Sequence, residues 1–434
     1  MAPFLIMKQT LLIRDEQLGL AGQGAIIDAG LYKNMVFKHD KQRHILFGVG
    51  GIHSEKLITG EVIRKPEAQP KRHMLTFSQP TTSSGIKLQK YELQDDTGRI
   101  LFSRELQSNG KYSLPSFVDE FKQDYSGISA HPLLSTVYDD QPWHFFFTGS
   151  ARELIDMMKE VRTHLVHPSK EAQLESAEAQ AIRLVLTYAE WAAYGLNLGH
   201  LLRTMSYVGP LRARPERLYE YVERKPLDVG PKGNFAPQIV NDWLETGQKD
   251  LIEELNFWLR KFEFGEKIER QTLFERGFSL EVRGKRARES ISIADTGFGL
   301  SQVLPLIVQC LYSQENELII AEQPEIHLNP KLQNILADLF CRFATAGRTI
   351  VIETHSEHLL LRLRTLVARQ EIRAEDVALY YVEKIGQECK IREVKIEEDG
   401  HIPDEEWPRG FMEEYLREPL ALALAQARRS SDAQ

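Results

Sequence analysis

A carboxylate at the end of an apolar run is the first group in this sequence that could do chemistry. Residues 318–321 are all apolar and read as a buried strand, and Glu322 follows them directly. Ligands bind at the carboxyl ends of strands in open α/β sheets, where a carboxylate can hold Mg²⁺ directly or through water. An ordinary core strand with a polar end is the alternative. Asn329 and Pro330 then read as the N-cap and first residue of a helix.

Two further segments carry groups that suit a phosphate. A second apolar strand, 349–353, runs into Thr354-His355-Ser356, where His355 could contact a phosphate oxygen and Ser356 could cap a helix. The turn at 294–299 contains Gly299 and leads into an apolar helix with Ser301 and Gln302 in its first turn. Helix N-termini of this kind bind anions through free N–H groups. The alternatives are a structural histidine and an ordinary loop-to-helix junction.

The pattern around these segments predicts the scaffold that positions them. Strands at 318–321, 349–353 and 377–382 alternate with helices at 330–343 and 356–369. This alternation predicts an α/β fold with a parallel sheet and helices on its faces. Helical spacing also marks 238–262.

The N-terminal half reads differently. Strand signals fill 43–148, and two strands at 87–93 and 99–102 flank an Asp-Asp-Thr-Gly turn, which predicts an antiparallel β subdomain. Residues 4–13 read as a short helix without an N-cap, and 151–202 as mainly helical. We therefore expect four regions: 1–150 with the β subdomain, 151–235 with a helical insertion and a basic loop, 236–400 as the α/β core, and an acidic 401–434.

Composition excludes several classes of protein. The net charge is −8, and −6 of it lies in 391–420, so the rest has no basic excess for tight, non-specific nucleic-acid binding. Three widely spaced cysteines fit neither a disulfide framework nor a structural zinc site, and they suit a reducing cytoplasm. No apolar run reaches the length of a membrane span, and the first residues lack the pattern of a signal peptide.

The three segments, in this order, resemble the second half of an ABC-type ATPase of the SMC-like and OLD-nuclease-like class of bacterial AAA-labelled ATPases. Residues 322–328 resemble the Walker B and D-loop region, 299–302 the signature, and 354–356 the switch histidine. Residues 207–212 and 407–411 (Trp-Pro-Arg-Gly-Phe) resemble marks of a subgroup with a C-terminal domain of unknown function.

The resemblance implies a mechanism in which two heads dimerise around ATP and Mg²⁺. Glu322 would contact Mg²⁺, with Gln323 beside it at the catalytic position, and His355 would sense the γ-phosphate. Gly299, Ser301 and Gln302 would act on the nucleotide of the partner head, and His327 and Asn329 would belong to the D-loop. Catalysis would be mainly electrostatic and positional.

Three departures from the family pattern stand out. The sequence contains no GxxxxGK[ST] loop, and its opening residues resemble the helix that follows such a loop, which suggests a chain that starts just past it. Gln323 stands where many relatives have the catalytic glutamate, and an amide is no base at neutral pH. Glu325 could replace that base, although a solvated acid is the favoured interpretation. Asn329 stands where relatives usually have histidine.

Two hypotheses remain open. The first is an ATP-hydrolysing head, acting as a homodimer or a head-to-tail heterodimer in DNA-associated or anti-phage defence work with a separate nuclease or effector. The second is a non-hydrolysing dimerisation or binding module. Nucleic-acid binding without ATP would depend on a basic stretch that we interpret mostly as surface ion pairs: Arg203, Arg212, Arg214, Arg217, Arg224 and Lys225.

Overall fold

The computed structural model describes two parts of the chain. The described residues are 9, 45–52, 71–78, 87–95, 97–106, 116–117, 201–222, 224–273, 277–284, 289–386, 388–403, 407, 421–422 and 424–426. Contacts divide the chain into Met1–Met205 and Ser206–Gln434, and each unit is described by itself. The helix predicted at 4–13 lies outside the described residues except for helical Gln9, and the helical region predicted at 151–202 lies outside them up to residue 200.

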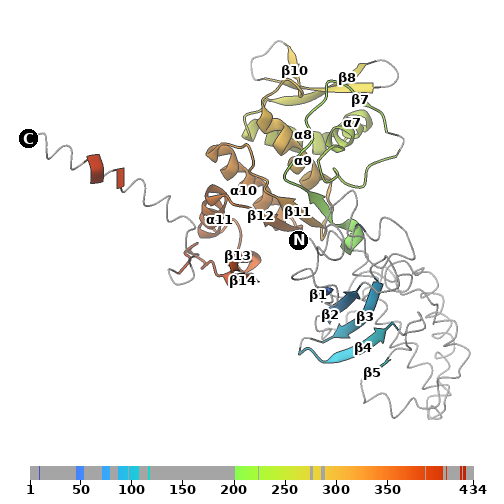
Figure 1. Ribbon diagram of the computed structural model, residues 1–434. Coiled ribbons are helices and arrows are strands. Elements are labelled where there is room, and N and C mark those ends of the chain that lie inside the picture. The colour runs from blue at the N-terminus through green and yellow to red at the C-terminus, as the bar shows by residue number, and fades with distance from the viewer. Residues whose placement is uncertain are drawn as a thin grey trace, which may run out of the picture. The chain divides into compact units, whose positions relative to one another are not determined.

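The first unit contains an antiparallel sheet whose strands follow one another in chain order (Figure 1, blue to cyan). The strands are β1 (Ile45–Ile52), β2 (Lys71–Ser78), β3 (Lys87–Gln94), β4 (Ile100–Glu105) and β5 (Ser116–Phe117). Asp95 closes the β3–β4 hairpin, because its Oδ1 accepts hydrogen bonds from the backbone N–H groups of Thr97 and Arg99 at 3.0 and 2.9 Å. The predicted hairpin is therefore confirmed.

The second unit is built on a parallel sheet of three strands in the order β12-β11-β6. β6 spans Ser206–Val208, β11 spans Leu318–Glu322 and β12 spans Thr349–Glu353. β11 lies in the centre and its four apolar residues are buried, whereas β12 is paired on one side only among the described residues, and Val351 on it is 39% exposed. Both strands that carry the predicted chemistry are confirmed, and their carboxyl ends lie at one edge of the sheet because Glu322 pairs with Glu353.

Helices cover this sheet and form one core with it. They are α7 (Ala236–Thr246), α8 (Lys249–Lys261), α9 (Phe298–Tyr312), α10 (Pro330–Thr345) and α11 (Glu357–Ala368). The helical signal over 238–262 is divided between α7 and α8 at Gly247, whose φ of 70° ends the first helix. α9 is apolar almost all round and runs through the core, which includes Trp243, Trp258 and Phe262.

A glycine on a neighbouring loop fixes the middle of α9. Gly233 has a φ of 68°, and a Cβ atom there would overlap the ring of Pro305, which lies inside the helix. Only glycine fits at this position, for conformational and for steric reasons. The loop after β6 is therefore held tightly against the helix that carries the predicted signature.

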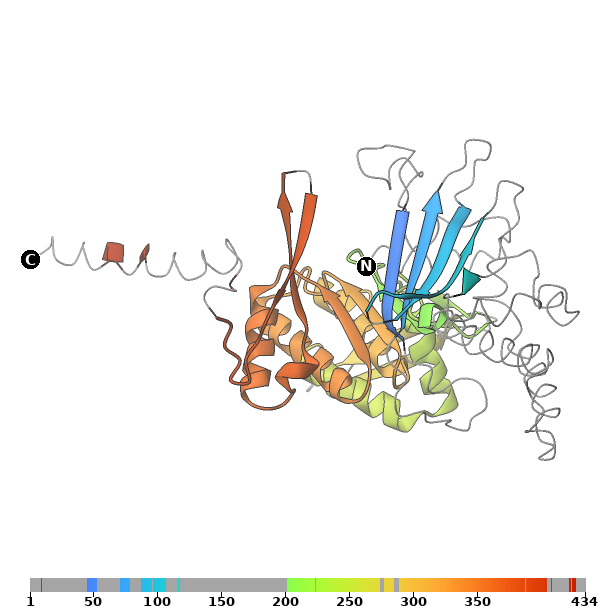
Figure 2. The same cartoon turned by 90° about the horizontal axis from the view of Figure 1, so that it is seen from below.

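Two smaller sheets complete the second unit. β7 (Tyr219–Glu220), β8 (Lys267–Leu273), β9 (Gly277–Arg283) and β10 (Ser290–Ser292) form an antiparallel sheet. β13 (Leu379–Ile385) and β14 (Glu388–Val394) form an antiparallel hairpin after the short 3₁₀ helix Ala374–Asp376. Figure 2 shows this hairpin projecting beyond the helices.

The hairpin corrects one expectation. The strand predicted at 377–382 exists in shifted form, but it does not extend the parallel sheet. A tight turn at Gly386, with a φ of 64°, folds the chain back so that β13 pairs with β14 instead. Among the described residues, no helix is both long and apolar enough to cross a membrane.

Candidate functional site

A tyrosine on β6 holds the carboxylate at the end of β11. Tyr207 pairs with Ile320, and Glu322 lies two residues further along β11, so both side chains stand on the same face of the sheet. The phenol Oη of Tyr207 donates a hydrogen bond to Oε2 of Glu322 at 2.8 Å. Partial burial, and then the bond and charge of Glu322, raise the pKa of Tyr207, so the phenol stays protonated and remains a donor.

An arginine from the loop after β6 contacts the backbone at the same point. The guanidinium of Arg212 donates to the carbonyl oxygen of Glu322 at 3.1 Å and to that of Gln323 at 3.4 Å. Arg212 is only 6% exposed. Burial lowers its pKa to about 10, with the charge of Glu325 acting in the opposite direction, so the side chain is cationic at neutral pH. The interpretation of Arg212 as a surface ion pair is therefore wrong.

The chain leaves β11 through a strained residue. Gln323 has a φ of 41°, and its backbone N–H donates to the carbonyl of Glu353 on β12 at 2.8 Å. A left-handed conformation costs a non-glycine residue roughly 1–2 kcal/mol, so the surrounding contacts must maintain it. The turn that follows contains a second such residue, His327, with a φ of 64°.

Glu325 links this turn to the segment after β12. Its Oε1 accepts the backbone N–H of His355 at 2.9 Å, and its Oε2 is buried with no hydrogen-bond partner among the described residues. The favoured interpretation of Glu325 as a solvated acid is therefore wrong. Burying Oε2 of Glu325 without a hydrogen bond costs desolvation free energy, and the positive charge of Arg212 offsets part of that cost.

His355 itself reaches solvent. Its side chain is 79% exposed, and Nε2 lies 3.4 Å from Oε1 of Glu353, within ion-pair distance when the ring is protonated. Ser356 caps α11 by accepting the N–H of Leu359 at 2.9 Å and also donates to Gln333 on α10 at 2.6 Å. The cap fixes the backbone next to His355 while the imidazole stays available.

The residues that resemble the signature lie at the start of α9, and their side chains are satisfied locally. Ser301 and Gln302 are buried. The hydroxyl of Ser301 donates to the carbonyl of Phe298 at 2.6 Å, and Nε2 of Gln302 lies 3.4 Å from that hydroxyl. A Cβ atom at Gly299 would lie 3.1 Å from the ring of Phe264. Neither buried side chain is presented to a second molecule in this arrangement.

The start of α9 nevertheless adjoins the turn after β11. The ring of Phe298 meets the ring of His327 edge-on, with centroids 5.0 Å apart, and the guanidinium of Arg214 lies 5.9 Å above Phe298. Asn329 caps α10 by accepting the N–H of Leu332 at 3.0 Å, as predicted. The structure thus brings Glu322, Gln323 and His355 together at one edge of the sheet, with the α9 start beside His327.

The metal-binding groups at the end of β11 suit an Mg²⁺ ion that binds together with a nucleotide. In the described parts of the chain, no group of three or more histidine, cysteine, aspartate or glutamate side chains is placed to hold a metal ion. One oxygen of Glu322 is engaged by Tyr207, which leaves the other for a cation. Mg²⁺ is commonly bound by one or two carboxylates together with substrate phosphates, so the residues present fit Mg²⁺ with a nucleotide.

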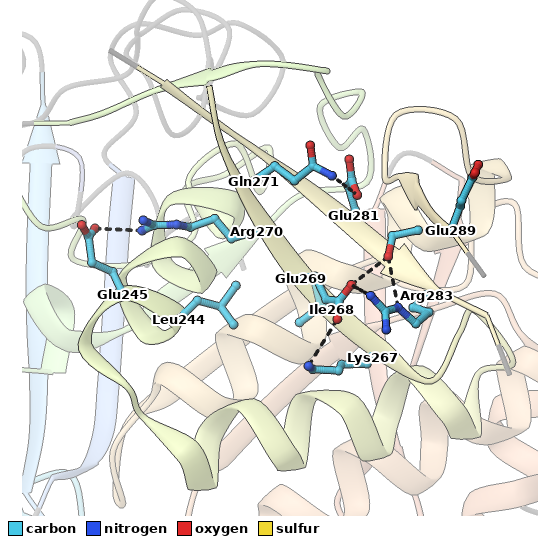
Figure 3. Close-up of a pocket in the computed structure, with 11 residues that line it drawn as sticks. Leu244, Glu245, Lys267, Ile268, Glu269, Arg270, Gln271, Glu281, Arg283 and Glu289 are labelled. Atoms are coloured by element: carbon cyan, nitrogen blue, oxygen red, sulfur yellow. Dashed lines mark hydrogen bonds and ion pairs between the residues drawn. The ribbon is translucent and has the colours of Figure 1, made fainter. Parts of the chain in front are cut away.

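A hollow elsewhere in the second unit does not compete for this role. It has a volume of about 820 Å³ over β8, β9 and β10 beside α7, and Figure 3 shows Arg270 turned toward Glu245 and Arg283 turned toward Glu269. Arg270 pairs with Glu245 at 3.3 Å and Arg283 pairs with Glu269 at 2.8 Å. The hollow offers no positive field for phosphates, because carboxylates outnumber cations in its lining: Glu245, Glu269, Glu281 and Glu289 against Lys267, Arg270 and Arg283.

Basic residues in the segment after β6 form ion pairs with acidic residues of the same chain. Arg217 pairs with Asp295 at 2.6 Å and Lys225 with Asp242 at 3.0 Å, both exposed pairs as expected. Sequence reasoning missed the roles of Tyr207 and Arg212, although Tyr207 and Val208, which both favour strands, were a signal before Gly209 that this segment joins the sheet.

Comparisons with known proteins match two parts of the chain. The profile of an AAA ATPase domain matches residues 232–360, which include α9, Glu322 and His355. The profile of a protein family of unknown function, DUF3696, matches residues 372–422, which include the β13–β14 hairpin and the Trp-Pro-Arg-Gly-Phe segment. Among curated proteins, no significant match was found.

The solved structures that the chain matches include SMC ATPase heads. One comes from work on ATP-driven dimerization and DNA-stimulated activation of SMC ATPases, with 12% identity, a TM-score of 0.28, and coverage of 36% of this chain and 89% of that one. An Smc head with a coiled coil and joint from Pyrococcus yayanosii has 9% identity, a TM-score of 0.27, and coverage of 65% and 46%. An Smc head with an extended coiled coil, bound to the C-terminal domain of ScpA, from Pyrococcus furiosus has 10% identity, a TM-score of 0.28, and coverage of 75% and 77%.

The two family matches agree with the features on which the sequence resemblance rests. The AAA match contains the α9 start, the end of β11 and the end of β12, and the second match contains the C-terminal mark. Residues 232–360 are therefore similar to an AAA ATPase domain, and residues 372–422 are similar to the C-terminal domain of unknown function DUF3696.

Proposed function

We propose that this chain binds ATP with Mg²⁺ and hydrolyses it at the edge of the β12-β11-β6 sheet. The observation that carries the proposal is the Glu322 carboxylate, which leaves the central strand and is held at one oxygen by Tyr207. A preoriented carboxylate at this position is suited to Mg²⁺ that accompanies phosphates. Bound Mg²⁺ would neutralise phosphate charge, which is the main requirement of phosphoryl transfer.

The other residues have distinct roles in this proposal. His355, exposed and backed by Glu353, donates a hydrogen bond to a phosphate oxygen. Gln323 orients the attacking water, because its amide can hydrogen-bond water but cannot take its proton. The α9 start, with Gly299, Ser301 and Gln302, acts on a nucleotide held by a second chain in a head-to-tail dimer, which requires Ser301 to leave its bond with Phe298.

The most specific part of the proposal is the cellular process in which ATP hydrolysis is used. The resemblance supports a cytoplasmic, DNA-associated or anti-phage defence complex in which a nuclease or other effector is a separate protein. The absence of a GxxxxGK[ST] sequence and the presence of Gln323 favour a second candidate, a binding module with the same fold and no hydrolysis.

Calorimetry of Mg²⁺–ATP binding distinguishes these candidates. The 434-residue chain is compared with the same chain extended upstream to the next in-frame start and with its Glu322→Gln variant. Binding that weakens in Glu322→Gln, together with phosphate release, supports the ATPase. If neither length of chain binds Mg²⁺–ATP, the ATPase proposal fails and the binding module takes its place.

A further inference from the structure

Arg212 is a buried cation in a loop whose neighbours are exposed. Leu211 is 74% exposed and Arg214 is exposed, whereas Arg212 is almost fully covered. Burying a guanidinium is costly unless its N–H groups are satisfied. Two of its nitrogens donate to the carbonyls of Glu322 and Gln323, and Nε is buried without a hydrogen-bond partner in the part of the chain that the structure describes.

The backbone that Arg212 contacts cannot hold its conformation alone. The peptide between Glu322 and Gln323 leads into a left-handed residue. Its N–H donates to the carbonyl of Glu353 and its carbonyl accepts from Arg212, which also donates to the carbonyl of the next peptide, so this backbone is held from two sides. A planar guanidinium can donate to two neighbouring oxygens at once, which the single ammonium group of lysine does less well.

The same cation faces the group that fixes the His355 segment. The carboxylate of Glu325 contributes favourably to the charged state of Arg212, and its Oε1 accepts the N–H of His355. Arg212 therefore contacts the end of β11 directly, and its charge acts on Glu325, which holds the backbone of His355. Loss of its contacts would free both ends together.

We infer that Arg212 is the positioning residue of this site, holding the Glu322–Glu325 turn so that Glu322 and His355 stand correctly toward the same nucleotide. The expected effect of Arg212 on ATP turnover rests on the proposed function. Its hold on the Glu322–Glu325 turn does not, because that turn is already formed in the nucleotide-free chain. The forked pair of hydrogen bonds carries the effect, and the positive charge alone does not replace it.

Backbone amide exchange in the nucleotide-free, full chain tests the holding role directly. We expect both Arg212→Lys and Arg212→Gln to speed exchange at 322–329 and at His355 by about tenfold or more, with α8 and β9 unchanged. Arg217→Lys, an exposed arginine of the same loop, is the matched control and leaves 322–329 unchanged. Unchanged exchange at 322–329 in Arg212→Lys, or faster exchange throughout the unit, overturns the inference.

Steady-state kinetics tests the catalytic consequence separately. In Arg212→Lys we expect kcat to fall about 10- to 100-fold while KM for ATP changes by less than about threefold, because geometry and not nucleotide affinity is lost. The inference is contradicted if Arg212→Lys raises KM with unchanged kcat, or if this variant keeps the kcat of the unaltered protein. If the unaltered protein shows no turnover, the proposed function fails, and the exchange experiment still decides the role of Arg212.

Discussion

The end of β11 and the start of α9 are built in opposite ways. At the end of β11, residues far apart in the sequence converge on Glu322: Tyr207 and Arg212 are more than 100 positions away, and Glu353 comes from the neighbouring strand. At the start of α9, Ser301 is satisfied by Phe298 only three residues away, and its side chain is buried. A site assembled by long-range contacts is ready for a ligand, whereas a locally satisfied one must rearrange to meet a partner.

The largest effect on ATP turnover is expected from removing the charge of Glu322 at the end of β11. Glu322→Gln keeps the size of the side chain and its acceptor for Tyr207, but it removes the anionic ligand that we propose for Mg²⁺. We expect ATP turnover to fall about 100-fold or more, equal to at least about 2.7 kcal/mol of transition-state stabilisation. Phosphate release measures it, with exposed Glu315→Gln before the same strand as the control. Turnover within threefold of the unaltered protein would remove Glu322 from the site.

A mixing experiment asks whether the two regions serve one site from two chains. In the proposed head-to-tail dimer, we expect Ser301→Ala and Glu322→Gln each to inactivate a dimer of their own kind, whereas a mixed dimer has one site with both native groups. Random exchange makes half of the dimers mixed, so we expect about a quarter of the native turnover to return. Turnover that stays at the level of the separate variants would mean that α9 does not act on a second chain.

A tenfold effect is expected from the phenol that orients the carboxylate. Tyr207→Phe removes one hydroxyl and leaves Glu322 free to rotate. We expect kcat to fall about tenfold, or about 1.4 kcal/mol, and the Mg²⁺ concentration for half-maximal turnover to rise. Tyr312→Phe, which removes another part-buried phenol that bonds to the carbonyl of Pro226, is the control. An equal fall in both variants would point to general destabilisation.

The smallest effect concerns the stability of the locally satisfied region. Ser301→Ala removes the hydroxyl bond to Phe298 and should lower the free energy of unfolding by about 1 kcal/mol. Ser313→Ala, at the other end of α9, removes a comparable bond from Gln309 and serves as the reference. Denaturant unfolding followed by tryptophan fluorescence compares them. A stabilised Ser301→Ala protein would mean that the native hydroxyl is strained for a partner.

The regular elements of the second unit could be predicted because their signals are local. An apolar run with a polar end fixed β11 and β12 to within a residue. Asn329 and Ser356 mark the starts of α10 and α11 because each caps a helix with its own side chain. These interactions join residues three positions apart, and one sequence is enough to indicate them.

The rest depends on which segments meet in space. Arg212 and Glu325 look like surface charges because nothing near them in the sequence reveals their partners, which are 110 and 30 positions away. The strand predicted at 377–382 belongs to the β13–β14 hairpin and not to the parallel sheet, because strand propensity says nothing of the neighbouring strand. In the first unit, the β3–β4 hairpin could be predicted because the residues of its turn are a local signal.

The left-handed backbone at Gln323 constrains how this protein can evolve. Branched residues such as valine or isoleucine are excluded there by their conformation, whereas glutamate has the same shape as glutamine and fits without rearrangement. Glutamine and glutamate codons differ at a single base. If Gln323 orients water as we propose, the chain is one mutation away from carrying a general base at the same position, and the contacts that hold the turn allow that exchange in either direction.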